Sequence, residues 1–114
     1  MSSGCNVVDI GEVPTPLLYF STFKTNISDG VMLTGSHNPK NYNGFKIVIN
    51  KRSMTSEKIK KIKSMIEEEV FMEGSGKFSS LDINDDYLKV LKEKIKINSK
   101  MKVCLDCGNG VGGV

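Results

Sequence analysis

A serine, the only histidine of the chain and a lysine occur close together, as Ser36, His37 and Lys46. A serine hydroxyl is a weak nucleophile until a base removes its proton or its oxygen already carries a phosphoryl group. A nearby imidazole or ammonium group moves protons and stabilises the charge of a phosphate. These residue types therefore indicate nucleophilic or phosphoryl-transfer chemistry.

Simpler interpretations of the same residues stay open at this point. The sequence Ser-His-Asn-Pro is common in ordinary turns, and Lys46 also fits a solvated lysine on a strand. A serine hydrolase is disfavoured because the Gly-x-Ser-x-Gly elbow is missing, and Asn38 stands where its second glycine would be. The spacing alone does not decide between chemistry and a turn.

Two apolar stretches flank these residues and predict the strands that position them, at 30–34 and 44–50. In the second strand Phe45 and Ile49 share one face, so Lys46 points to the other. We expect Lys46 to be exposed there. The reactive side chains would then converge on the polar loop between the two strands.

The remaining pattern alternates strands and helices. Residues such as Ile59, Ile62 and Ile66 recur at helical spacing, and Asp82 is placed to cap a further helix. We expect a strand at 5–10, a helix from 15 or 16 to about 26, a helix at 55–70, a flexible connector at 73–77, a helix from about 82 to 95 and a strand at 101–106. This order predicts an α/β fold with a mixed sheet layered with helices.

The length of the chain limits the number of domains. With 114 residues, of which 39% are hydrophobic, it can form one core but not two. The strand at 101–106 leads into a glycine turn with no partner strand or helix after it. We therefore expect an incomplete domain at 1–98 and the truncated start of a second α/β domain at 99–114.

Composition narrows the classes of partner and compartment. A formal net charge of +3 arises from bases mixed with acids, which disfavours nucleic acid but is compatible with a small anionic substrate. The sequence has neither an apolar run long enough for a membrane span nor the pattern of a signal peptide. We therefore expect a cytoplasmic protein without a membrane partner.

Cysteine and glycine motifs near the C-terminal end offer competing functions. The chain has three cysteines, an odd number that disfavours a disulfide framework, and Cys104 and Cys107 would face opposite ways on a strand. Gly108, Gly110 and Gly113 fit a dinucleotide-binding fingerprint, which needs a strand before it and a helix after it. A dinucleotide-binding domain is thus one alternative, and a non-enzymatic interaction domain is another.

The loop sequence Thr34-Gly-Ser-His-Asn-Pro-Lys-Asn-Tyr-Asn-Gly-Phe-Lys-Ile47 resembles the phosphoserine signature of the α-D-phosphohexomutases. Within that family it is most similar to bacterial enzymes that act on both mannose and glucose phosphates. Two further segments, 9–20 and 103–113, resemble the region before the signature and the start of the second domain of the family. The resemblance covers nearly the whole chain, in the order of the family.

The resemblance implies roles for individual residues. Ser36 corresponds to the serine that is phosphorylated and whose phosphate is a ligand of Mg²⁺. His37 and Lys46 correspond to residues that line the active site, and Lys46 is the better candidate for proton transfer. Thr34 and Asn38 correspond to residues that support the loop at 34–46.

The resemblance also implies an activity. The parent enzyme would be an isomerase of carbohydrate metabolism, moving a phosphoryl group reversibly between the 1- and 6-positions of mannose or glucose phosphates through a hexose 1,6-bisphosphate. It would require Mg²⁺ and be a monomer or a dimer. The metal, sugar and phosphate loops of the family lie in its other domains, so we expect the 114 residues alone to be inactive.

Overall fold

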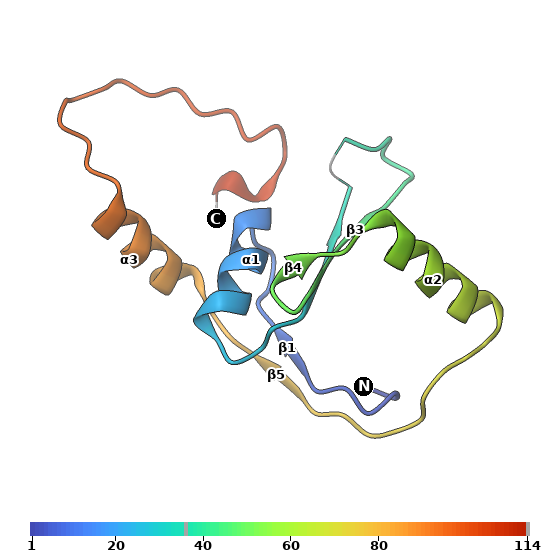
Figure 1. The fold of residues 1–114 in the computed structure, drawn as a ribbon. Helices are drawn as coiled ribbons and strands as arrows, with labels where there is room; N and C mark the ends of the chain where they lie inside the picture. Colours follow the sequence, from blue (N-terminus) through green and yellow to red (C-terminus); the bar gives the residue numbers. More distant parts are fainter. Residues whose placement is uncertain (36, 114) are drawn as a thin grey trace.

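The computed structural model describes residues 1–35 and 37–113, and it contains an antiparallel sheet, a parallel strand pair and helices (Figure 1). In the described residues the antiparallel sheet has the order β2-β3-β4, and β1 pairs in parallel with β5. The elements in chain order are β1 (Val7–Asp9), α1 (Thr15–Lys24), β2 (Gly30–Thr34), β3 (Gly44–Ile49), β4 (Arg52–Ser53), α2 (Ser56–Glu67), β5 (Phe78–Ser80), α3 (Asn84–Lys94) and the 3-10 turn η1 (Val111–Gly113). The predicted α/β class and mixed strand pairing are confirmed.

Helix α1 lies at the centre of this arrangement. Pro14 holds an extended conformation before the helix, with φ −60° and ψ 148°, and Pro16 occupies its first turn, where proline needs no hydrogen-bond partner. The helix ends at Lys24 because Thr25 is extended. The predicted start is therefore confirmed, and the predicted end lies two residues too far along the chain.

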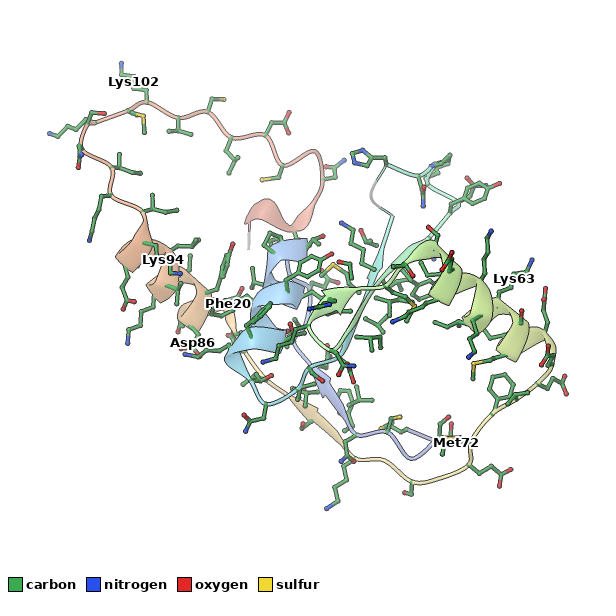
Figure 2. All side chains as sticks on the ribbon, viewed as in Figure 1. Phe20, Lys63, Met72, Asp86, Lys94 and Lys102 are labelled. Atoms are coloured by element: carbon green, nitrogen blue, oxygen red, sulfur yellow. The ribbon has the colours of Figure 1, made fainter. Side chains whose placement is uncertain are left out.

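The core forms where α1 meets the start of α3. Val13, Leu17 and Ile83 are buried together, and Phe20 and Tyr87 pack against them with ring centroids 5.2 Å apart at 65°. Lys24 and Asp86 form an ion pair of 3.2 Å on the same flank, and Phe20 and Asp86 are labelled in Figure 2. Apolar burial, with an edge-to-face aromatic contact, thus joins these two helices.

The register of β2 and β3 decides which side chains α1 covers. Met32 pairs with Lys46, and Gly30 pairs with Val48, which is fully buried. A methyl group added at Gly30 would lie 2.8 Å from Leu18 Cδ1, so α1 packs closely on this face. The predicted alternation along β3 is confirmed, but the expected exposure of Lys46 is wrong, because its face is the one that α1 covers.

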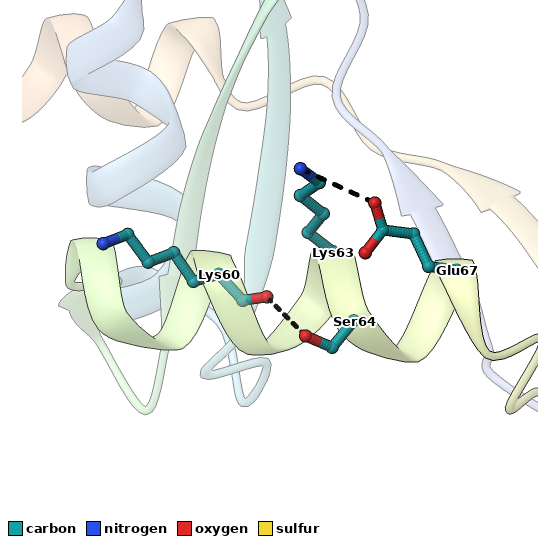
Figure 3. Close-up of polar contacts among 4 residues, drawn as sticks. All are labelled: Lys60, Lys63, Ser64 and Glu67. Carbon is teal, nitrogen blue, oxygen red and sulfur yellow. Dashed lines mark hydrogen bonds and ion pairs between the residues drawn. The ribbon is translucent and has the colours of Figure 1, made fainter.

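The helix α2 is shorter than predicted and lies largely in solvent. It ends at Glu67, because Glu68 leaves the helical conformation and Glu69 has a φ of 54°. Figure 3 shows its polar surface, where Lys63 and Glu67 form an ion pair of 3.5 Å and Ser64 Oγ donates to the Lys60 carbonyl at 3.4 Å. Exposed pairs of this kind contribute little to stability.

The helix α3 also begins later than its expected cap. Asp82 Oδ1 accepts a hydrogen bond of 2.9 Å from the Asn84 amide, but Ile83 occupies the N-cap position. The acids Asp85 and Asp86 in the first turn suit the positive end of the helix dipole. The predicted helix is therefore confirmed, with its start displaced by the buried Ile83.

Residues 73–77 are paired rather than forming the expected flexible connector. The Gly74 amide donates to the Ser2 carbonyl at 2.8 Å, and the Gly76 amide donates to the Met1 carbonyl at 3.0 Å. A methyl group on Gly76 would overlap the Cys5 carbonyl oxygen, so the absence of a side chain permits this approach. The pairing continues into β5, which the sequence pattern did not predict.

The expected strand at 101–106 is wrong, since these residues, all within the described part of the chain, form no strand. Val103 and Leu105 are 78% and 75% exposed, and no described strand pairs with them. A strand requires a partner for its backbone groups, and the apolar sequence alone does not supply one. Figure 1 shows this segment as a long loop (orange to red) between α3 and η1.

The chain is less compact than a typical domain of its length. Its radius of gyration is 17.2 Å, whereas a compact chain of about 100 residues has a radius of about 13 Å.

No helix within residues 1–35 or 37–113 combines the length and apolar character that crossing a membrane requires.

Candidate functional site

The loop that carries the predicted site joins β2 to β3 after their last pair, Thr34 and Gly44. Ser36 lies outside the described residues, so its predicted role stays a prediction. Two turns shape the described part of the loop. The Asn38 amide donates to the Gly35 carbonyl at 2.8 Å, and the Tyr42 amide donates to the Pro39 carbonyl at 2.9 Å.

Gly44, at the end of the loop, lies close to the Thr34 carbonyl group and to the Asn38 side chain. A methyl group added at Gly44 would lie 3.0 Å from the Thr34 carbonyl oxygen and 3.5 Å from Asn38 Nδ2. This places the Asn38 amide over the first residue of β3. The supporting role of Asn38 stays a prediction.

His37 and Lys46 lie in different environments. His37 is exposed on the loop, whereas Lys46 is half-buried. Lys46 Nζ donates to Thr15 Oγ1 at 3.2 Å, and Thr15 Oγ1 in turn donates to Met32 Sδ at 3.5 Å. The structure thus joins Lys46 to α1 and β2, and the convergence of Lys46 with Ser36 and His37 stays a prediction.

A large cavity borders Thr15 and Met32, whereas His37 and Lys46 are not among its lining residues. Its volume is about 1070 Å³, and its lining includes Thr15, Met32, Thr34 and Gly35. The turn at 107–111 and the loop at 11–14 line it as well. The strand end that leads into the predicted serine loop therefore opens onto space large enough for a ligand.

The sequence around the loop is rich in positive charge, although Lys51 and Arg52 follow the end of β3 that is remote from the loop. The segment from Gly30 to Ser56 contains no aspartate or glutamate, but it contains Lys40, Lys46, Lys51 and Arg52. The bases and acids balance much more closely in the chain as a whole, at sixteen and thirteen. Lys40 in the loop and Lys46 two residues after it favour an anionic ligand such as a phosphate.

Comparison with known proteins identifies the family. Residues 1–73 match the model of the family described as phosphoglucomutase/phosphomannomutase, alpha/beta/alpha domain I. The chain belongs to this family. The match includes the whole of the loop and every predicted site residue.

Individual members of the family agree with this assignment. The chain is 45% identical over 111 residues to the phosphomannomutase/phosphoglucomutase of Pseudomonas aeruginosa, covering 97% of this chain and 24% of that protein. It is 41% identical to the phosphoglucomutase of Neisseria meningitidis serogroup B, covering 97% and 25%. The chain spans about a quarter of the length of these relatives.

A solved structure also matches. The crystal structure of a phosphoglucomutase/phosphomannomutase family protein from Burkholderia thailandensis aligns with a TM-score of 0.79 and 32% identity. The alignment covers 86% of this chain and 23% of that one. The fold of the chain is therefore that of part of a phosphoglucomutase/phosphomannomutase family protein.

The alternative interpretation, a dinucleotide-binding domain, lacks the strand that its glycine turn requires. A dinucleotide-binding turn requires a strand immediately before it, and residues 101–106 form none. The Gly108 amide instead donates to Asp106 Oδ1 at 2.8 Å, and the Gly110 amide donates to the Cys107 carbonyl at 2.7 Å. These bonds make a local turn ahead of η1.

Metal binding receives no direct support from the described residues. None of their histidines, cysteines, aspartates or glutamates form a group of three or more that could hold a metal ion. The predicted ligand of Mg²⁺ is a phosphate on Ser36, which lies outside the described residues.

Thr15 was not identified as a site residue from the sequence. The pattern indicates only the start of a helix at this position, because a proline in the first turn favours a helix start. Its contact with Lys46 spans 31 positions along the chain. Such a contact depends on how α1 packs on β3, which local sequence does not specify.

Proposed function

We propose that the protein containing this chain is a phosphohexomutase that moves a phosphoryl group between the 1- and 6-positions of mannose or glucose phosphates. The observation that carries the proposal is the family match over residues 1–73, which contain the Thr34–Lys46 loop with its serine, histidine and lysine. The cavity at the end of β2, and the lysines Lys40 and Lys46 in and beside the loop, agree with a phosphorylated ligand.

In the proposed reaction, phosphorylated Ser36 gives its phosphoryl group to a free hydroxyl of the hexose phosphate. The bond between phosphorus and Ser36 Oγ breaks, a bond to the sugar oxygen forms, and one proton passes from the sugar hydroxyl to the serine oxygen. The product is a hexose 1,6-bisphosphate. After it turns around, the reverse step returns its other phosphate to Ser36.

We assign the proton transfer to Lys46. Its amine accepts the proton of the sugar hydroxyl in one direction, and its ammonium returns it in the other. His37 is proposed to line the site and to balance phosphate charge. Thr34, at the end of β2, and Asn38, over Gly44, are proposed to hold the loop in place.

The proposal includes the cofactor, compartment and organisation. Mg²⁺ is the proposed metal, with the phosphate on Ser36 as one ligand, and it would neutralise phosphoryl charge when bound. A hexose 1,6-bisphosphate is the proposed activator, and the protein is proposed to be a cytoplasmic monomer or dimer. Residues 1–98 are proposed as part of the first domain and 99–114 as the start of the second.

A coupled mutase assay tests the proposal. The full protein that carries this chain should convert mannose 1-phosphate and glucose 1-phosphate, and the ratio of their kcat/KM values gives the preferred sugar. Ser36→Ala should abolish turnover, whereas Ser99→Ala, at an exposed serine, should not change it. A Ser36→Ala protein that keeps the wild-type rate would overturn the proposal.

The 114 residues expressed alone provide a second assay. They should show no turnover, because the proposed loops for metal, sugar and distal phosphate lie elsewhere in the protein. Measurable conversion by this chain alone would show that those loops are not required.

A further inference from the structure

Three elements meet at the hydroxyl group of Thr15. It is the first residue of α1, and its Oγ1 lies 3.2 Å from Lys46 Nζ of β3 and 3.5 Å from Met32 Sδ of β2. Met32 and Lys46 are direct cross-strand partners. The Thr15 hydroxyl therefore lies over a pair of facing side chains just below the predicted serine loop.

The backbone around Thr15 is restrained on both sides. Pro14 and Pro16 each fix one φ angle, and the Leu17 amide closes the turn by donating to the Pro14 carbonyl at 2.9 Å. The neighbouring side chains of Val13 and Leu17 are anchored in the core. Because its neighbours cannot shift easily, the position of the Thr15 oxygen is well defined.

The direction of the two hydrogen bonds orients the lysine. A hydroxyl group has one proton, and Thr15 directs it to the sulfur of Met32. Its lone pairs then face the ammonium of Lys46, which donates one of three N–H bonds. Within residues 1–35 and 37–113 this is the one hydrogen bond found for the ammonium, which leaves two N–H positions for a substrate oxygen. Hydrogen bonds are stronger in the lower dielectric of a half-buried site than in water. These two bonds therefore restrain the rotation of the Lys46 side chain.

We infer that Thr15 is a positioning residue for Lys46 in the proposed reaction. Its hydroxyl holds the Lys46 amine in the position and orientation that proton transfer requires. This inference rests on the proposed function. Thr15 lines the cavity with Met32, Thr34 and Gly35, and its hydroxyl links this cavity wall to the Lys46 amine, which is not itself a lining group. Displacement of a reacting group by about 1 Å lowers rates by about 100-fold.

The test compares two substitutions at position 15 in the full protein. Thr15→Val keeps the shape but removes the hydroxyl, and it should lower kcat about 10- to 100-fold while KM changes less than about twofold. Thr15→Ser keeps the hydroxyl and should recover most of the rate. In a Lys46→Met background, Thr15→Val should cause no further loss, because both changes remove one function.

Thr22→Val is the matched control. Thr22 is a buried threonine on the same helix, and its hydroxyl donates to the Tyr19 carbonyl at 2.8 Å without touching Lys46. It should lower the melting temperature at least as much as Thr15→Val but leave kcat unchanged. An unchanged kcat in Thr15→Val, or an equal loss in Thr22→Val, would overturn the inference.

The outcomes separate this inference from the proposed function. Mass spectrometry of each variant reports whether Ser36 is phosphorylated. If Ser36 carries phosphate and Thr15→Val turns over at the wild-type rate, only the positioning role fails. If Ser36 never carries phosphate in the wild-type protein, the proposed function fails, and this inference fails with it.

Discussion

Lys46 of β3 pairs directly with Met32 of β2, and both side chains lie on the sheet face that α1 covers. The lysine is therefore held by contacts with the body of the domain rather than standing in solvent. Its amine is fixed relative to Thr15, and its backbone is two residues from the end of the serine loop at Gly44. This arrangement gives the proposed proton-transfer group a defined position.

Replacing Lys46 should affect rate more than stability. Lys46→Met in the full protein should lower kcat by about 10²- to 10⁴-fold, the usual contribution of an acid–base group. It should cost about 0.5–1.5 kcal/mol of unfolding free energy through the lost bond to Thr15. Steady-state kinetics and urea unfolding measure the two effects.

Lys58→Met on α2 is the control for removal of a positive charge, since Lys58 is exposed. Its rate should equal that of the wild-type protein. If Lys46→Met also keeps the wild-type kcat, Lys46 has no part in the mechanism.

A methyl group at Gly76 should destabilise the parallel pair β1–β5. Gly76→Ala would drive its side chain into the Cys5 carbonyl oxygen, and overpacking of this kind costs about 1–3 kcal/mol. Hydrogen exchange should accelerate at the amides of Val7 and Leu81, which bond across this pair. Gly113→Ala is the control, because a methyl group there meets nothing within 4 Å. Equal exchange in both variants would contradict the observed pairing.

Removing side-chain volume at Ile83 should destabilise the contact between α1 and α3. Ile83 is 1% exposed and packs with Val13 and Leu17, so Ile83→Ala should cost about 2–5 kcal/mol in denaturant unfolding. Ile97→Ala, at a residue that is 66% exposed, should change stability by less than about 0.5 kcal/mol. Similar losses in the two variants would show that Ile83 is not a core residue.

Local sequence predicted the elements that depend on local interactions. The strand at Gly30–Thr34 was predicted with its observed bounds, and α1 was predicted from Thr15, because an apolar run and a proline in the first turn act over a few residues. The ends of α2 and α3 were less accurate. They depend on single backbone conformations, such as the positive φ of Glu69.

Apart from the helix ends, the incorrect predictions concern contacts between distant residues. The segment 101–106 has the apolar sequence of a strand but no described partner, and β5 has a weak strand sequence but pairs with β1. The burial of Lys46 depends on which sheet face α1 covers. The serine loop was found through a resemblance to a family, since its residue types alone also fitted an ordinary turn.

Phosphate on residue 36 is the most direct test of this account. The full protein, incubated with Mg²⁺ and glucose 1,6-bisphosphate, should gain one covalent phosphate by intact-mass spectrometry, and peptide mapping should place it on Ser36. Ser36→Ala should gain none, whereas Ser99→Ala should gain the same amount as the wild-type protein. A protein that converts hexose phosphates but never carries phosphate at position 36 would contradict the account.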